Sequence, residues 1–382
     1  MDWLTFPTVM EVAQILGVGN ARVVGGAVRD RLFGQAAHDI DIATALPPET
    51  VMALLKKANI KAIPTGITHG TVTAVFPDGP IEITTLRSDV TTDGRRATVA
   101  FTDDWRADAA RRDFTINALY SDPITGEVFD YFGGSDDLSA GLVRFIGAPL
   151  ERIAEDHLRI LRFFRFHARF GKGAPDAQSL SACAARANDL MALSRERIAD
   201  ELLKLLALPE PQDTVELMFD HGVFAPILPE ITTTELLASL KGADPIRRFA
   251  SLLPADPKIA DAVAKRFKLS KAITKRLVRA AGRNPDDAAH PKALAYWLGM
   301  EAAEDRLLLS GGTDALAALD GWDIPLFPIT GSFIIKRGVP AGPSVALILK
   351  AVEAQWVAEE FPDMTRVGAI VDGLIHNDVK NI

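Results

Sequence analysis

Paired carboxylates stand out first in this chain. Asp39 and Asp41 alternate with Ile40 and Ile42 in the segment HDIDIAT. On a strand both aspartates would project to one face while both isoleucines pack on the other. Adjacent carboxylates repel each other unless a cation joins them, and hard oxygen ligands suit Mg²⁺ bound together with substrate phosphates. The alternative is a pair of solvated aspartates on an edge strand.

A third carboxylate, Glu82, stands between isoleucines in the segment IEITTLR. We expect it to meet the aspartate pair from a neighbouring strand. Three carboxylates could hold two metal ions, an arrangement that activates a hydroxyl nucleophile and stabilises departing pyrophosphate in phosphoryl transfer. The alternative is an ordinary solvent-facing strand residue.

A glycine pair precedes the aspartates at a spacing that favours phosphate binding. In RVVGGAVRD a predicted strand runs into Gly25 and Gly26, and Arg29 follows in the first turn of a predicted helix. Glycines let the backbone approach a ligand, and a helix that starts there directs unpaired N–H groups at an anion. Alone, the pair would be a plain turn. Joined to the aspartates, which begin ten residues after Arg29, the glycine pair predicts a phosphate and metal site.

Two kinds of side chain that suit a nucleotide, arginine and aspartate, occur in ARRDFTINAL. Arg111, Arg112 and Asp113 come before an apolar run that we predict to be helical, in which Asn117 is the polar exception. Arginine can fork onto phosphate, and aspartate can accept a hydrogen bond from a ribose hydroxyl. The alternative is that Asp113 only caps the helix.

The segment ERIAEDHLRILRFFRFHARF predicts one amphipathic helix. Asp156, Arg159 and Arg162 follow each other along one stripe, and the leucines and phenylalanines form the packed side. A rigid Asp and Arg pair offers acceptors and donors together, so it could hydrogen-bond the Watson–Crick edge of more than one base. The alternative is a helix-surface ion pair worth about 0.3 to 0.5 kcal/mol.

The pattern of strands and helices expected around these residues predicts an α+β fold. Short β-branched runs alternate with amphipathic helices over the first third of the chain, whereas alanine, leucine and arginine in long helical periods dominate from about residue 150. One later segment, SFIIKRG at 332–338, looks like a strand. Proline-rich breaks indicate a series of small helical domains behind one mixed domain.

Composition excludes several classes of protein. The chain has 382 residues, a net charge of −8 and 48% hydrophobic residues, which predicts two or three folded domains. Its single cysteine, Cys183, excludes an intramolecular disulfide and a cysteine metal cluster. No basic leader and no run of about 20 apolar residues occurs. We therefore expect a cytoplasmic protein with no membrane partner and no obligate protein partner.

One basic run contrasts with the acidic whole. The segment KRFKLSKAITKRLVRAAGR carries eight lysines and arginines and no acidic residue. Contacts from such a stripe to phosphates would hold an RNA duplex by its shape. The residues predicted to bind RNA are Lys265, Arg266, Lys268, Lys271, Lys275, Arg276 and Arg279. The alternative is a solvated basic helix face.

Six segments together resemble a known family. In chain order VVGGAVRD, HDIDIAT, IEITTLR, RRDFTINAL, EDHLRILRFFRF and SRERIADELLKLL resemble the motif series of the class II tRNA nucleotidyltransferases. These CCA-adding enzymes belong with bacterial poly(A) polymerases in the DNA polymerase beta-like superfamily. The resemblance covers about the first 210 residues. It implies a mixed-sheet head over 1–142, then a helical neck over 143–208, body over 209–288 and tail over 289–382.

The resemblance also implies roles for individual residues. Asp39 and Asp41 would hold the catalytic Mg²⁺, with Glu82 completing the carboxylate set. The residues implied to bind the nucleotide are Gly25, Gly26, Arg29, Arg112, Asp113, Asn117, Asp156, Arg159 and Arg162. Asp156 and Arg159 would act as an amino-acid template for CTP and then ATP, and the segment around Arg197 would brace their helix. His157 departs from the family, which commonly has proline there.

The implied activity is addition of C, C and A to the 3′ end of tRNA from CTP and ATP. The close rival is an A-adding enzyme or a poly(A) polymerase. Residues 87–109 resemble the mobile loop of enzymes that complete the whole CCA end, and a strongly basic C-terminal extension is missing, which both favour CCA addition. Rivals from other classes are a catalytically idle RNA-binding protein and a nucleotidyltransferase acting on a small molecule.

Overall fold

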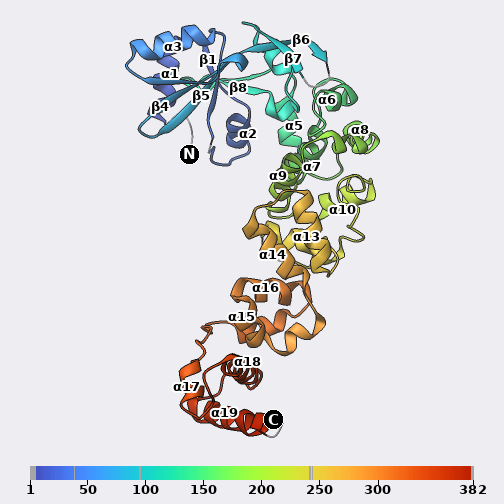
Figure 1. Cartoon of the computed structure of the whole chain (residues 1–382). Coiled ribbons are helices and arrows are strands. Elements are labelled where there is room, and N and C mark those ends of the chain that lie inside the picture. Colours follow the sequence, from blue (N-terminus) through green and yellow to red (C-terminus); the bar gives the residue numbers. More distant parts are fainter. Residues whose placement is uncertain (1–5, 38, 94–95, 241, 243, 380–382) are drawn as a thin grey trace. The chain divides into compact units, whose positions relative to one another are not determined.

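The computed structural model describes residues 6–37, 39–93, 96–240, 242 and 244–379. The chain divides into two compact units, Met1–Pro229 and Glu230–Ile382. Figure 1 shows the sheet and the first set of helices in one unit, whereas the described residues of the other unit form helices and no strand. The predicted α+β class is confirmed, with the mixed sheet at the N-terminal end. The finer boundaries at 142, 208 and 288 stay predictions.

A seven-stranded sheet forms the head of the first unit, in the order β3-β4-β5-β2-β1-β8-β9. Its strands are β1 (Ala21–Val24), β2 (Asp41–Thr44), β3 (Lys61–Gly66), β4 (Thr71–Phe76), β5 (Gly79–Thr85), β8 (Leu119–Ser121) and β9 (Val128–Asp130). Neighbouring strands are antiparallel except β2 and β5, which run parallel. The sheet thus brings together segments far apart in the sequence at its centre.

One face of this sheet is covered by helices, and the other face is open. Helices α1 (Pro7–Leu16) and α3 (Pro48–Lys57) pack against one face, where Ile42 and Ile83 are fully buried in a core with helix side chains such as Leu55. Burial of such a side chain contributes roughly 1.5 to 3 kcal/mol. Since strand residues alternate between faces, the neighbours of these isoleucines point to the other face, which carries the site.

Both edges of the sheet are short or irregular. The edge strand β3 pairs with β4 and with no other described strand. It contains Pro64, and its register shifts between Ile63 and Gly66. At the opposite edge β9 has three residues. A separate two-stranded hairpin consists of β6 (Arg87–Asp93) and β7 (Arg96–Phe101). It falls in the segment that resembles a mobile loop, of which residues 94 and 95 lie outside the described residues.

Helices complete the first unit. They are α2 (Gly26–Leu32), α4 (Trp105–Ala110), α5 (Gly134–Ala140), α6 (Pro149–Glu155), α7 (Arg159–Phe170), α8 (Ala177–Ala185), α9 (Arg195–Leu206) and α10 (Gln212–Asp220), with short 3₁₀ turns η2 (Ile67–His69), η3 (Thr115–Asn117) and η4 (Ala187–Ala192). In α7, Phe163, Phe164 and Phe170 are fully buried, which confirms that these phenylalanines form core. Arginines occupy the other side of α7.

The second unit consists of helices. They are α11 (Glu235–Ser239), α12 (Pro245–Ser251), α13 (Pro257–Arg266), α14 (Lys271–Ala281), α15 (Pro291–Leu298), α16 (Met300–Leu309), α17 (Gly331–Ile335), α18 (Pro343–Ala358) and α19 (Met364–Val379), with 3₁₀ turns η5 (Pro285–Ala289) and η6 (Thr313–Ala318). No helix among the described residues is long and apolar enough to cross a membrane.

The strand expected at 332–338 is wrong. This segment contributes the short helix α17, and its Ile334 is fully buried in the core formed with α18 and α19. A β-branched run has only a weak preference for strands, and burial of Ile334 against two helices overrides that preference.

Candidate active site

The carboxylates meet on the open face of the sheet. Asp41 lies directly opposite Glu82 in the parallel register of β2 and β5, so both side chains leave the same face. Asp39 lies in a bend before β2 begins. The expectation that Asp39 and Asp41 share one strand is therefore wrong for Asp39. The strand begins later because its partner β1 ends at Val24, which pairs with Asp41.

The three carboxylates lie close enough to affect the pKa of Asp41. The pKa of Asp41 is raised above its ordinary value, first by loss of hydration and then by the negative charges of Glu82 and Asp39, while Arg112 acts in the opposite direction. The side chain of Asp41 remains open to a cavity of about 220 Å³ that Glu82 also lines. A bound cation would relieve this repulsion.

The residues present fit a hard divalent cation. No group of three His, Cys, Asp or Glu side chains among the described residues is arranged so that it could hold a metal ion by itself. Mg²⁺ is commonly held by one or two carboxylates together with substrate phosphates and water. Asp41 and Glu82, with Asp39 close enough to affect Asp41, match that pattern.

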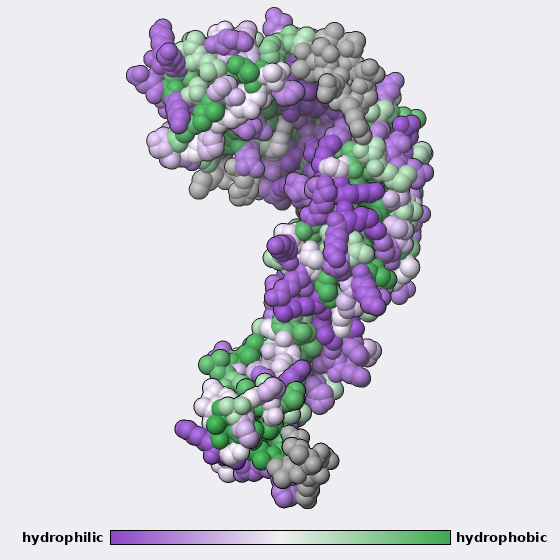
Figure 2. All heavy atoms as spheres, in the orientation of Figure 1, coloured by the Kyte–Doolittle hydropathy of each residue, from purple (hydrophilic) through white to green (hydrophobic). Residues whose placement is uncertain are grey.

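A larger cavity of about 430 Å³ lies in the same unit. Its wall is formed by Gly25, Gly26, Arg29, Arg111, Arg112, Asp113, Asn117, Asp156, Leu158, Arg159, Arg162, Phe166 and Arg197. In Figure 2 the first unit is hollowed next to its helices, and the side chains in the hollow are hydrophilic. Six arginines against two aspartates give this wall a strong positive charge, as binding of a triphosphate requires.

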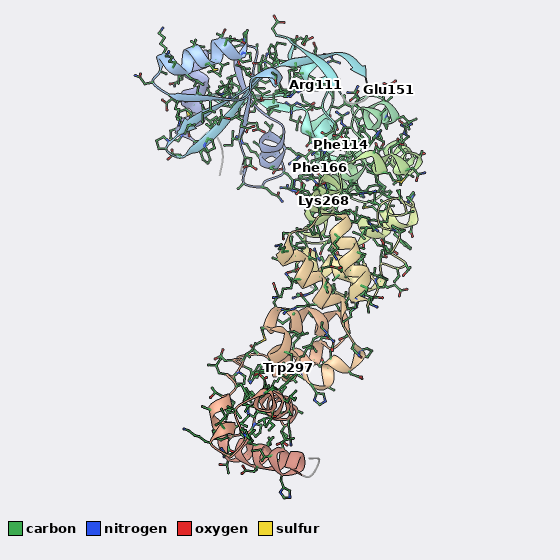
Figure 3. All side chains as sticks on the ribbon, in the orientation of Figure 1. Arg111, Phe114, Glu151, Phe166, Lys268 and Trp297 are labelled. Carbon is green, nitrogen blue, oxygen red and sulfur yellow. The ribbon has the colours of Figure 1, made fainter. Side chains whose placement is uncertain are left out.

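Two arginines line both cavities. Arg111 and Arg112 are shared by the carboxylate cavity and the arginine-rich cavity. Figure 3 shows Arg111, Phe114 and Phe166 following one another from the sheet toward α7. A molecule in the larger cavity that extends past these arginines would place its phosphates at the carboxylates.

Gly25 is the backbone element that brings β1 and α2 to this cavity. It has a φ of +69°, and a Cβ added there would lie 3.2 Å from Arg112 Nη1. A side chain would therefore strain the backbone and also press on the arginine.

We expect Gly25→Ala to weaken nucleotide binding more than it destabilises the fold. Gly34→Ala is the matched control, because Gly34 has a φ of +80° and nothing within 4 Å of the added Cβ. Both variants should lose roughly 1 to 2 kcal/mol of stability from strain. Only Gly25→Ala should raise the apparent dissociation constant for CTP, measured by calorimetry, and equal affinities in the two variants would contradict this role.

Arg29, Asn117, Asp113 and Arg162 form one continuous network. Arg29 Nη1 donates to Asn117 Oδ1 at 2.5 Å, and Asn117 Nδ2 donates to Asp113 Oδ1 at 2.9 Å. Arg162 Nε donates to Asp113 Oδ2 at 2.7 Å. Burial alone would raise the pKa of Asp113, but Arg162 and these hydrogen bonds outweigh burial and hold the pKa below its ordinary value. Asp113 is thus an ionised anchor for Arg162.

The helical run expected after Asp113 is wrong. The chain makes only the 3₁₀ turn η3 before it enters β8, where Leu119 and Tyr120 pair with β9. Both side chains are fully buried, each in a different core cluster. Asp113 does not cap a helix, since the residue before η3 is Phe114. Its side chain accepts the Phe114 amide at 2.9 Å instead.

The single helix expected across Asp156 is also wrong. Helix α6 ends at Glu155 and α7 begins at Arg159, because Asp156 adopts an extended backbone and its Oδ1 accepts the Leu158 amide at 3.1 Å. Asp156, Arg159 and Arg162 nevertheless line the same cavity. The break aims Asp156 at the cavity from the end of one helix and Arg159 from the start of the next.

Hydrogen bonds with other residues of this chain hold both Asp156 and Arg159 in place. Arg197 Nη2 donates to Asp156 Oδ2 at 2.7 Å. Arg159 forms an ion pair with Glu155 and donates to the carbonyls of Arg152 at 2.8 Å and Arg111 at 3.2 Å. Arg159 is therefore fixed by three acceptors, whereas Asp156 is held by the Leu158 amide and by one arginine.

Comparisons with known proteins agree with this geometry. Residues 21–144 match the family described as "Poly A polymerase head domain", and residues 174–234 match "Probable RNA and SrmB- binding site of polymerase A". The chain is 36% identical to the mouse (Mus musculus) CCA tRNA nucleotidyltransferase 1, mitochondrial, covering 88% of this chain and 82% of the relative. It is 31% identical to the CCA-adding enzyme of Levilactobacillus brevis, and the match covers 90% of this chain and 91% of that relative. The chain belongs to the family of CCA-adding enzymes.

The fold supports the same family. The crystal structure of the Bacillus stearothermophilus CCA-adding enzyme in complex with CTP matches all of this chain and all of that one, with a TM-score of 0.77 and 25% identity. Enzymes of the CCA-adding family are expected to need a divalent metal, which agrees with the carboxylates on β2 and β5. The expected cytoplasmic location stays a prediction, since the mouse relative is named mitochondrial.

Four cavity residues are absent from the set expected to bind nucleotide. They are Arg111, Leu158, Phe166 and Arg197. The position of Arg111 next to Arg112 is a usable signal, and Arg197 lies within the family segment SRERIADELLKLL, which is expected only to brace a helix. Phe166 lies beneath three arginines, with the Arg29 guanidinium 5.1 Å from its ring centre. Nothing in the helical pattern separates Phe166 from the core phenylalanines.

The basic run of the second unit divides into two groups. Arg276 donates hydrogen bonds to Asp305 and Asp244. Arg266 donates two hydrogen bonds to Glu230, and Arg279 donates one to the Leu298 carbonyl. In contrast Lys271 and Lys275 are exposed on α14, and Lys265 is exposed while pairing with Asp261. These arginines thus bind other segments of the second unit, whereas these lysines face solvent.

Proposed function

We propose that this protein adds C, C and A to the 3′ end of tRNA without a nucleic-acid template, using CTP and ATP. The observation that carries the proposal is the pair of adjoining cavities, one with carboxylates and one with arginines, that share Arg111 and Arg112. The names of the mouse and Levilactobacillus relatives support the same activity.

In the proposed reaction, Asp39 and Asp41 would hold Mg²⁺, and Glu82 would complete the carboxylate set. When bound, Mg²⁺ would stabilise charge on the phosphates and favour attack by the RNA 3′-hydroxyl on the α-phosphate, with pyrophosphate leaving. Arg29, Arg112 and Arg162 would neutralise the triphosphate, and Gly25 and Gly26 would allow it to approach the backbone.

The base would lie between α6 and α7. Asp156 supplies acceptors and Arg159 supplies donors there, so the pair can match the edge of cytosine or of adenine. Asn117 and Asp113 would position Arg162 and receive the ribose. The first unit, Met1–Pro229, then contains the proposed head over 1–142, the neck over 143–208 and the start of the body. The body over 209–288 and the tail over 289–382 would be available for RNA.

The deciding experiment supplies each nucleoside triphosphate to tRNA transcripts that end before CCA, after C, or after CC. Use of CTP on the first two and of ATP only on the last, with products that stop at CCA, is the expected result. No incorporation on any transcript would overturn the proposal in favour of an idle RNA-binding protein.

The second candidate is an A-adding enzyme or poly(A) polymerase. The matched descriptions of residues 21–144 and 174–234 both name poly(A) polymerase, which is the observation that favours it. In the same assay, ATP use restricted to the transcript ending in CC would identify an A-adding enzyme, and long adenylate products would identify a poly(A) polymerase.

We expect Lys271→Glu combined with Lys275→Glu to weaken tRNA binding. These exposed lysines on α14 would lose phosphate contacts, so the slope of log affinity against log salt should fall by about 1 to 2. The control Lys56→Glu with Lys57→Glu makes the same charge change at two exposed positions of α3. A salt slope that is the same in both double variants would assign the α14 lysines to a solvated face.

A further inference from the structure

One carboxylate beside the two cavities belongs neither to the carboxylate set nor to the nucleotide set discussed above. Asp108 lies on α4, its surface is 3% exposed, and it lines the carboxylate cavity. An ionised group this deeply buried requires several donors, because loss of hydration is costly.

Four donors from three segments surround Asp108. Its Oδ1 accepts the Arg87 amide at 3.1 Å and Arg111 Nε at 3.0 Å. Its Oδ2 accepts the Tyr120 hydroxyl at 2.7 Å and Arg112 Nη2 at 3.3 Å. Burial alone would raise the pKa of Asp108, but both arginines and these hydrogen bonds outweigh burial and hold the pKa below its ordinary value.

The two arginines bound by Asp108 are the ones shared by both cavities. Tyr120 adds a second restraint, since its hydroxyl also accepts Arg112 Nε at 3.2 Å. The remaining arm of Arg112 points at the Gly25 end of the larger cavity, 3.2 Å from where a Cβ would lie. The carbonyl of Arg111 meanwhile accepts Arg159 Nη2, so this arginine is held from two directions.

We propose that Asp108 is a positioning residue for the triphosphate, which fixes the Arg111 and Arg112 guanidinium groups at the junction of the two cavities. The inference rests on the proposed function and adds a residue to it. A free arginine side chain loses rotamer freedom when it binds phosphate, and a side chain already fixed in place avoids that loss. Asp108 also balances two neighbouring positive charges that would otherwise repel each other before the substrate arrives.

A purely structural role makes a different prediction. If Asp108 only fastened α4 to β6 and β8, its loss would lower thermal stability and the amount of active enzyme, with the Michaelis constant for nucleotide unchanged. A positioning role instead changes the response to the triphosphate and to pyrophosphate specifically, since both use the same arginines.

The test compares Asp108→Asn with Asp104→Ala in the full-length protein. Asp104 caps the same helix by accepting the Arg106 and Ala107 amides, so Asp104→Ala destabilises α4 without touching Asp108. We expect Asp108→Asn to raise KM for CTP about tenfold or more, as loss of hydrogen bonds to charged groups implies. Its kcat and its KM for tRNA should change about threefold or less, and inhibition by inorganic pyrophosphate should weaken by the same factor as CTP binding.

A second variant and a second readout keep the test decisive. Tyr120→Phe removes only the hydroxyl that restrains Arg112, and it should raise KM for CTP by about threefold. Binding of inorganic tripolyphosphate, measured by calorimetry, requires no turnover. Weaker tripolyphosphate binding in Asp108→Asn than in Asp104→Ala supports the inference even if the wild-type chain incorporates no nucleotide. Equal tripolyphosphate affinity in these two variants, or an unchanged KM for CTP in an active Asp108→Asn and Tyr120→Phe, overturns it.

Discussion

Asp41→Asn should lower nucleotide incorporation by at least about 1000-fold, because several kcal/mol of charge stabilisation at the phosphates would be lost with the metal. Asp41 is the best test of the carboxylate site, since its raised pKa reports the closeness of Glu82 and Asp39. The measurement is single-turnover incorporation of labelled CTP into a transcript that ends before CCA.

The stability of this variant separates chemistry from folding. Removal of one charge relieves repulsion among the carboxylates, so Asp41→Asn should melt at the same temperature as the wild type or higher. Asp78→Asn makes the same charge change at an exposed position of the head and should keep full activity. Retained turnover in Asp41→Asn, or a loss of activity accompanied by a fall in melting temperature, would contradict the metal assignment.

Arg159→Ala should reduce discrimination among the four nucleoside triphosphates by about 10- to 100-fold, the range expected for loss of a base-reading arginine. Arg159 is bound by Glu155 and two carbonyls, so its donors stand at a fixed place in the cavity wall. The measured quantity is the ratio of kcat/KM for CTP to that for UTP on the transcript ending before CCA.

Affinity for tRNA should stay the same in Arg159→Ala, since Arg159 lies in the nucleotide cavity. Arg186→Ala is the matched control, because this arginine of the same unit makes a partly exposed ion pair with Asp189 and lies outside that cavity wall. Unchanged discrimination in Arg159→Ala, or an equal fall in both variants, would remove the template role from Arg159.

The carboxylate site was predictable from sequence because alternation is a local property. The isoleucines around Asp41 and Glu82 fix which face each strand buries, and the structure adds that the two strands are parallel neighbours. Alternation could not locate the start of β2, since strand length depends on where the partner β1 ends. Asp39 therefore stays outside the strand although its residue pattern matches Asp41.

The helix break at Asp156 was not predictable from helical periodicity. Periodicity measures which residues face the core, and it continues across a break that keeps both helices packed. What ends α6 is a hydrogen bond from the Leu158 amide to the Asp156 side chain, a local competitor of the helix. The family commonly has proline at this position, a residue that favours the start of a helix, and His157 removes that signal from this chain.

The basic run shows a different limit of sequence reasoning. A count of charges along 265–283 omits acidic residues that come from elsewhere in the chain. Asp244 and Asp305 bind Arg276 from positions about 30 residues away in each direction. Such partners are apparent only once the helices are packed, which is why the lysines and not the arginines are the better test of RNA binding.

The irregular edge of the sheet has a consequence for association between copies of this chain. An exposed strand edge can pair with the edge of another molecule and seed aggregation. Strand β3 resists this, because Pro64 lacks an amide hydrogen to donate and the register shift after Ile63 bends the strand. A foreign strand that did add could pull its neighbours out of register, and a slip of one residue would turn Glu82 away from Asp41. Protection against aggregation at the rim thus also protects the chemistry at the centre.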